Sequence, residues 1–186
     1  PSKILINDIF LSTLRKEDIQ SGIGEIVKIS ILDDKKTIEY NEVINCIQKN
    51  YVKKDIIERS LNIKKEIIEI DEFDNGLRNI MNYGHTFGHA IETMTKYAIP
   101  HGIAVGIGIF LANEISCMIY GYRDISVDKM VNTFNIKNLD YCEVFKNCYE
   151  SNQYLDILSK DKKNLNSFEI CCILMIDNKT VKKVSI

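Results

Sequence analysis

All three histidines of this 186-residue chain lie between positions 85 and 101, and they are the residues best suited to chemistry. They occur in the segment Arg78-Asn-Ile-Met-Asn-Tyr-Gly-His-Thr-Phe-Gly-His-Ala-Ile-Glu92, followed by Pro100-His-Gly102. On a continuous helix at ~100° per residue, one face carries the polar residues Arg78, Asn82, His85 and His89. The opposite face carries the apolar residues Ile80, Phe87, Ile91 and Met94. Imidazoles four residues apart can converge on a metal or a ligand.

A simpler interpretation is that this polar face meets water, as most polar helix faces do. The chain builds its other polar faces from Lys, Glu and Asp, however, and not from Arg, Asn and His. Gly84 and Gly88 would each cost about 1 kcal/mol in a helix interior. Another helix or a ligand is therefore expected to approach the backbone closely at these glycines.

Three charged residues fall in apolar surroundings. Glu25 and Lys28 are the only charges between Gly22 and Leu32, and a buried charge is costly unless it is paired or bound to a metal. They could form an internal ion pair, or Glu25 could be a carboxylate ligand and Lys28 an anion contact. Lys64 projects from the apolar face expected for the helix 53–70, where it could extend to the surface or into a polar pocket.

These spacings predict a divalent metal held by two histidines and one carboxylate, with a fourth position open and cations nearby for an anionic substrate. Such an open set is typical of a catalytic and not a structural zinc site. Spacing leaves the ligand pair undecided: His85 with His89, or either of them with His101.

The expected fold is mainly α, because helical periodicity covers most of the chain and its prolines are confined to Pro1 and Pro100. A short strand is expected at residues 3–7, with Ser12 as the N-cap of a helix over 13–32. The β-rich runs 168–176 and 180–186 predict a C-terminal hairpin. Residues 1–10 would then be a strand and linker from a missing N-terminal domain, and 11–186 one helical domain. Further helices are expected at 41–49, 53–70, 75–96, 102–120, 127–133 and 139–149.

Composition narrows the class of protein. With 45% hydrophobic and 27% charged residues, the chain is expected to be globular. A net charge of -2 without a basic stripe argues against a nucleic-acid partner. The most apolar run, 103–112, is too short to cross a bilayer, so no membrane partner is expected. Six cysteines without a C-x-x-C pair indicate buried, reduced thiols and a cytoplasmic protein.

The motif at residues 82–92, followed by His101-Gly-Ile-Ala-Val-Gly-Ile-Gly108, resembles the signature of the 3-dehydroquinate synthase family. Further segments of that family's pattern occur in the expected order, namely Gly22-Ile-Gly-Glu-Ile-Val-Lys28, Asp71-Glu72, Gly76-Leu-Arg78 and Asp161-Lys-Lys163. The resemblance runs from Pro1 to near the C-terminus.

This resemblance implies Glu25, His85 and His101 as ligands of a divalent metal, Zn²⁺ or Co²⁺. It implies catalytic roles for His89, Lys28 and Asn82. It further implies that the substrate is bound by the same three residues with Lys64, Arg78 and Lys162, for which Lys163 is an alternative. The implied reaction converts 3-deoxy-D-arabino-heptulosonate 7-phosphate, a sugar phosphate, to 3-dehydroquinate and phosphate in the shikimate pathway.

The family uses bound NAD, which its glycine-rich N-terminal domain holds, and no phosphate-cradling loop of that kind occurs here. The chain alone is therefore expected to be inactive, and the complete enzyme to be a homodimer. Ile103 stands where the family has Glu, and Ser21 where Ala is common. The alternatives are another sugar-phosphate cyclase (a 2-deoxy-scyllo-inosose or valiolone-type synthase), a metal-dependent polyol dehydrogenase, or a non-catalytic helical binding module.

Overall fold

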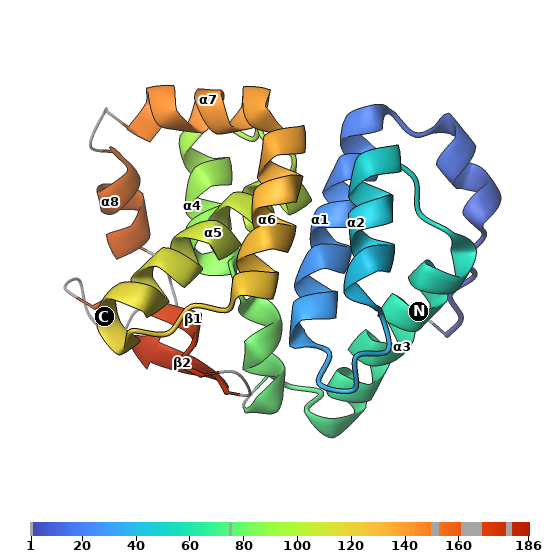
Figure 1. Cartoon of the computed structure of the whole chain (residues 1–186), viewed down its shortest axis with the longest axis horizontal. Coiled ribbons are helices and arrows are strands. Elements are labelled where there is room, and N and C mark those ends of the chain that lie inside the picture. The colour runs from blue at the N-terminus through green and yellow to red at the C-terminus, as the bar shows by residue number, and fades with distance from the viewer. Residues whose placement is uncertain (1, 75, 150–152, 161–168, 178–179) are drawn as a thin grey trace.

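The fold was analysed in a computed structural model of the whole chain, which describes residues 2–74, 76–149, 153–160, 169–177 and 180–186. Helices dominate, and a two-stranded antiparallel sheet stands near the C-terminus, so the predicted mainly helical class with a C-terminal hairpin is confirmed (Figure 1). The elements in order are η1 (Asp8–Thr13), α1 (Lys16–Leu32), α2 (Tyr40–Lys49), α3 (Lys54–Ile70), η2 (Leu77–Asn82), α4 (His85–Met94), α5 (His101–Tyr120), α6 (Ile125–Lys137), α7 (Leu139–Tyr149), α8 (Gln153–Ser159), β1 (Cys171–Met175) and β2 (Val181–Ser185).

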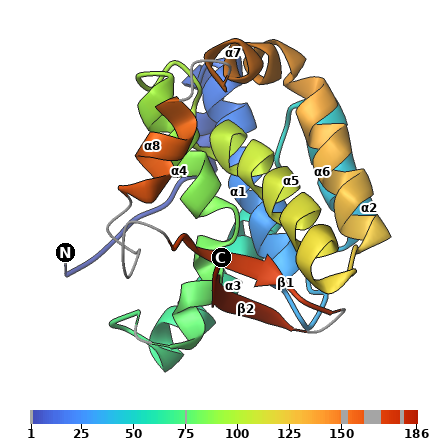
Figure 2. The same ribbon diagram turned by 90° about the vertical axis from the view of Figure 1, so that its left-hand side faces the viewer.

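Helix α5 is the centre of the packing and contacts α1, α4, α6 and β1. It is long and apolar enough to cross a membrane by length and composition, a longer run than the sequence suggested. However, 61% of its most apolar window is buried inside the protein, as expected for a core helix. Its neighbours surround it in the two perpendicular views of the ribbon (Figures 1 and 2).

Glycines allow the helices to approach α5 at backbone distance. A Cβ on Gly24 of α1 would lie 2.1 Å from the carbonyl oxygen of Gly102 in α5. A Cβ on Gly108 would lie 2.1 Å from the carbonyl oxygen of Gly84. A Cβ on Gly88 would lie 3.2 Å from the backbone of Ala104, so the approach expected at Gly84 and Gly88 is made by another helix.

The single helix expected over residues 75–96 is wrong. A 3-10 helix, η2, ends at Asn82, and α4 begins at His85 after Gly84, whose φ of 74° lies in the left-handed region that glycine favours. The break turns Arg78 and Asn82 off the axis of α4, so they do not continue the histidine face of one helix. Glycine's backbone freedom outweighed the apolar periodicity on which the prediction rested.

The strand expected at Lys3–Asn7 is also wrong. These residues are exposed and irregular, and they lead into η1, where Ser12 donates a hydrogen bond to the Ile9 carbonyl and does not cap a helix. Arg15 is the N-cap of α1. A strand needs a partner to satisfy its backbone, and the described part of the chain offers none here.

The C-terminal hairpin is confirmed, with Leu174 opposite Lys182 in the antiparallel register. Strand β1 is buried along its length, because it packs under α4 and α5 (Figure 2). Thr86 donates a hydrogen bond to the Cys171 carbonyl at 3.1 Å, and Ser116 donates one to the Met175 carbonyl. The hairpin thereby closes the base of the two helices. Helix α8 was not predicted.

Replacing Gly24 with Ala tests the contact between α1 and α5. Because the new methyl group would meet backbone and not a movable side chain, the helices must separate. We expect a loss of about 2–4 kcal/mol in unfolding free energy, more than the ~1 kcal/mol that Ala gains in a helix. Urea denaturation measures it.

Gly22→Ala on the same helix is the matched control, because its Cβ would meet nothing within 4 Å. This variant should be as stable as the unmodified chain or up to about 1 kcal/mol more stable. A Gly24→Ala protein equal in stability to Gly22→Ala would contradict the proposed close contact.

Candidate metal centre

The structure brings the three histidines together. The ring centroids of His85 and His89 lie 5.2 Å apart, as do those of His85 and His101, and those of His89 and His101 lie 5.8 Å apart. His85 and His101 are the first residues of α4 and α5, so two helix starts position them. His85 is buried, His101 is partly buried and His89 is exposed. A purely solvated polar face is therefore wrong for His85.

Glu25 completes a compact group with two of these histidines. Its Oε1 lies 3.6 Å from Nε2 of His85 and 3.5 Å from Nε2 of His101. Oε1 is buried, and among the described residues it has no hydrogen-bond partner. An orphaned buried carboxylate oxygen is unfavourable unless something else, such as a cation, satisfies it.

The spacing of these three atoms suits a metal ion. Ligands about 2.1 Å from a tetrahedral ion stand about 3.4 Å from one another, close to the separations found here. Glu25, His85 and His101 can each offer one ligand atom within 4.8 Å of the others. The chain can therefore hold a divalent cation with two imidazoles and one carboxylate.

Hydrogen bonds made by Nδ1 orient the rings of His85 and His101 so that Nε2 of each faces Glu25. Nδ1 of His85 lies 3.2 Å from the Tyr83 carbonyl, which can only accept, so this nitrogen carries the proton of the neutral ring. Burial, and after it the positive charge of Lys28, lowers the pKa of His85 to about 3. His85 is consequently neutral at physiological pH, as a metal ligand must be.

Lys28 lies beside the same group and is almost fully buried. Its Nζ donates a 2.8 Å hydrogen bond to Oε2 of Glu25 and lies 3.4 Å from Nε2 of His85. The internal ion pair of Glu25 with Lys28 is thus present, and it uses the oxygen that does not face the histidines. Burial lowers the pKa of Lys28, and the charge of Glu25 partly offsets this effect.

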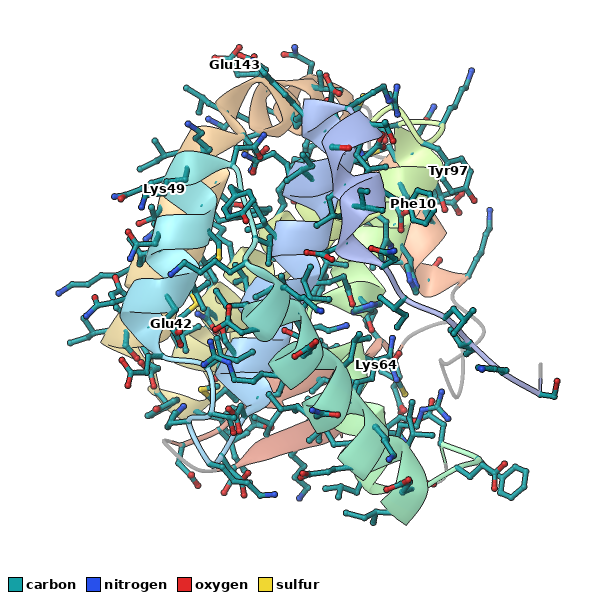
Figure 3. All side chains as sticks on the ribbon, turned by 90° about the vertical axis from the view of Figure 1, so that its right-hand side faces the viewer. Phe10, Glu42, Lys49, Lys64, Tyr97 and Glu143 are labelled. Carbon is teal, nitrogen blue, oxygen red and sulfur yellow. The ribbon has the colours of Figure 1, made fainter. Side chains whose placement is uncertain are left out.

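Lys64 is exposed, at the edge of α3 away from α2 (Figure 3). Its charge contributes to the lowered pKa of Lys28, so the two ammonium groups are electrostatically coupled. Lys64 and Glu25 also line one cavity of about 740 Å³ between η1, α1 and α3. Apolar side chains such as Ile26 and Leu61 make up most of the remaining wall. Lys64 thus reaches both the surface and the neighbourhood of Glu25.

Arg78 and Asn82 lie on η2, which contacts α1 and α3. The Arg78 guanidinium donates a 2.6 Å hydrogen bond to the Glu72 carbonyl, and its backbone N–H donates to Asp71. These bonds hold the turn between α3 and η2. Lys162 and Lys163 lie outside the described residues.

Sequence reasoning missed the hydrogen-bonded residues that support the proposed ligand His85. The Tyr83 hydroxyl donates to Asn113, whose side-chain amide donates a 3.0 Å hydrogen bond to Asp128. Asp128 pairs with Arg123 at 3.2 Å. This hydrogen-bond network runs from the protein surface to Tyr83, the residue whose carbonyl accepts from His85. No spacing rule joins positions 83, 113 and 128, because they come from different elements.

Asn113→Ala tests this hydrogen-bond network, because the substitution would leave the fully buried Tyr83 hydroxyl without its acceptor. We expect a loss of about 1–3 kcal/mol in unfolding free energy by urea denaturation. The same substitution in a Tyr83→Phe background should cost less, since no hydroxyl then needs an acceptor. An equal cost in both backgrounds would show that the two side chains are not coupled.

Comparison with known proteins places this site in a family. A family model described as "3-dehydroquinate synthase C-terminal" matches residues 22–164, which include Glu25, Lys28, Lys64 and all three histidines. The match covers the helical body of the chain.

Individual relatives agree with this match. A bifunctional 3-dehydroquinate synthase/phosphatase of Fusobacterium nucleatum is 34% identical over 96% of this chain and 27% of its own length. The 3-dehydroquinate synthases of Pyrococcus abyssi and Helicobacter hepaticus are each 32% identical, over 88% and 90% of this chain and 47% of their own length. The chain thus spans between about a quarter and a half of these relatives. With the family model matching most of its length, this chain belongs to the 3-dehydroquinate synthase C-terminal family.

Proposed function

We propose that this chain supplies the metal-binding and most of the substrate-binding side chains of a 3-dehydroquinate synthase. The reaction would convert 3-deoxy-D-arabino-heptulosonate 7-phosphate to 3-dehydroquinate and phosphate, as a step of aromatic amino-acid biosynthesis. The observation that carries this proposal is the convergence of Glu25, His85 and His101 beside the buried Lys28, in a member of this family.

The ligand set favours a divalent ion that accepts nitrogen and oxygen donors, Zn²⁺ or Co²⁺. When bound, such an ion supplies Lewis acidity toward the substrate oxygens at the carbon that NAD oxidises, which makes the adjacent C–H more acidic. Glu25, His85 and His101 would hold the ion, while Lys28 keeps the second oxygen of Glu25 in place.

The remaining cations are proposed to bind the anionic groups of the substrate. Lys28 and Lys64 would hold its phosphate and carboxylate together with Arg78 and with Lys162 or Lys163. Asn82 would bind its hydroxyls, and both Asn82 and Lys28 keep the catalytic roles proposed for them. His89 is exposed beside the two ligand histidines, where an imidazole can take up and return a proton.

We further propose that NAD is held outside the matched region, because the family model matched here is the C-terminal one. The isolated 186-residue chain should then show no turnover. The homodimer of the complete enzyme and the division into residues 1–10 and 11–186 stay predictions. A cytoplasmic location is supported by six free cysteines, as expected in a reducing compartment.

Metal stoichiometry tests the ligand assignment. The purified chain should bind one equivalent of Zn²⁺, measured by equilibrium dialysis and elemental analysis. Glu25→Gln and His85→Ala should lose most of this metal, because each removes one of three ligands. At a free Zn²⁺ concentration 100 times the Kd, the ion should raise the free energy of unfolding by about 2.7 kcal/mol. EDTA should remove this gain.

His89→Ala is the matched control, because this substitution removes an imidazole from the same cluster while leaving the proposed ligands intact. It should retain the metal. If His89→Ala lost the ion and His85→Ala kept it, the ligand assignment would be wrong.

Product analysis tests the reaction. A complete enzyme containing this chain, given the heptulosonate phosphate and NAD, should release phosphate and form 3-dehydroquinate. His89→Ala should lower kcat by about 10²- to 10⁴-fold, and the exposed Glu143→Gln on α7 should not.

Absence of phosphate release would contradict the assignment as a synthase. Release with a different cyclic product would point to another sugar-phosphate cyclase. Oxidation without release would point to a polyol dehydrogenase, and a protein that neither binds metal nor turns over would be a helical binding module.

A further inference from the structure

Glu92 on α4 is a nearly buried carboxylate to which the reaction above assigns no role. The residue is 9% exposed, and its Oε2 lies 3.1 Å from Nδ1 of His101. A carboxylate in such a place is costly unless a donor satisfies it. His101 supplies that donor from the start of the next helix.

The two nitrogens of His101 face different partners. Nδ1 faces Glu92, and Nε2 lies 3.5 Å from Oε1 of Glu25. Both carboxylates can only accept a hydrogen bond, but the contact at Nδ1, 3.1 Å, is within hydrogen-bond length and shorter than the 3.5 Å contact at Nε2, so in the neutral ring the proton belongs on Nδ1. The lone pair of Nε2 then points toward Glu25, where a metal ion would need it.

We propose that Glu92 is a positioning residue, which fixes the tautomer and the ring orientation of His101 for metal binding. This role rests on the proposed metal site. It also explains a difference between the two histidines. Buried His85 is held by the neutral carbonyl of Tyr83, whereas the more exposed His101 is held by a charged acceptor. Carboxylate, imidazole and metal in this order are a recurrent arrangement that increases the basicity of the ligand nitrogen.

A competing arrangement uses the same carboxylate as a ligand. His89, Glu92 and His101 could themselves offer three ligand atoms within 4.8 Å of one another. His101 belongs to both groups, with Nδ1 facing Glu92 and Nε2 facing Glu25. The group with Glu25 is favoured, because Oε1 of Glu25 is buried and has no hydrogen-bond partner among the described residues, whereas Oε2 of Glu92 has His101.

Co²⁺ binding to the unmodified 186-residue chain and to its variants tests this role. Glu92→Ala should bind Co²⁺ about 10- to 100-fold more weakly than the unmodified chain. Glu92→Gln should fall between the two, because its amide oxygen can accept from Nδ1 without carrying a charge. Glu143→Gln is the control, since Glu143 is exposed on α7 and belongs to none of the contacts of the candidate site described above, so Co²⁺ affinity should stay unchanged.

A second measurement needs no metal. Because the carboxylates of Glu25 and Glu92 raise the pKa of His101, the measurement is made at a pH high enough for its ring to be neutral. In the metal-free chain at that pH, ¹⁵N NMR of the His101 ring should show the proton on Nδ1, and Glu92→Ala should shift the tautomer population toward Nε2. Glu92→Gln should keep the Nδ1–H form. If Glu92→Ala fails to fold, the weaker Co²⁺ binding expected of Glu92→Gln carries the test.

The outcomes separate this role from the metal site itself. Unchanged Co²⁺ affinity in both Glu92 variants, or an unchanged tautomer in Glu92→Ala, would overturn the positioning role and leave the metal site standing. Two bound ions in the unmodified chain, falling to one in Glu92→Ala, would overturn it in favour of a second site. If the unmodified chain binds no ion, the proposed metal site fails, and the positioning role fails with it.

Discussion

The contact between α1 and α5 at two glycines is the constraint on which the candidate site depends. Gly24 and Gly102 meet at backbone distance. Gly24 is followed directly by the proposed ligand Glu25, and Gly102 is preceded directly by the proposed ligand His101. Side chains larger than hydrogen would separate the axes, and the two ligand atoms would separate with them. The N–H of Gly102 also donates to the Ser21 hydroxyl at 2.9 Å, which fixes the register of the contact. The spacing of the proposed ligand atoms therefore depends on helix packing.

Burial and charge are balanced within a few ångströms of that contact. Burial raises the pKa of Glu25, but His101, Lys28 and His85 together lower it by more, so that the carboxylate is ionised. Lys28 loses hydration in the same place, and the carboxylate offsets much of that cost. A buried lysine beside two ligand histidines would repel a cation if it stood alone. Because it is bonded to Oε2, the pair leaves Oε1 as the electron-rich end facing the imidazoles.

Much of this arrangement was predictable from residue types, and part was not. Local patterns correctly gave α3, α7 and the hairpin within a residue or a few of their ends, because caps, periodicity and turn residues act over short distances. The break at Gly84 was missed, since apolar spacing continues across it. Which histidines join Glu25 could not be derived from spacing, because His101 comes from another helix start. Residue resemblance, and not geometry, suggested Glu25, His85 and His101, and the structure then brought those three together.

The candidate site is partly exposed to solvent. His101 has 42% of its side chain exposed, and both His89 and Lys64 lie on the surface, so the group of ligands is open on one side. Proton transfers and hydride chemistry next to a metal are favoured when bulk water is excluded and the electrostatic interactions are correspondingly strong. The described residues provide a firm base for an ion, made of helix starts and a buried ion pair, but no wall opposite that base. For the proposed reaction we expect a second surface to close over the histidines, and the relatives, about two to four times as long as the aligned part of this chain, have the length to supply one.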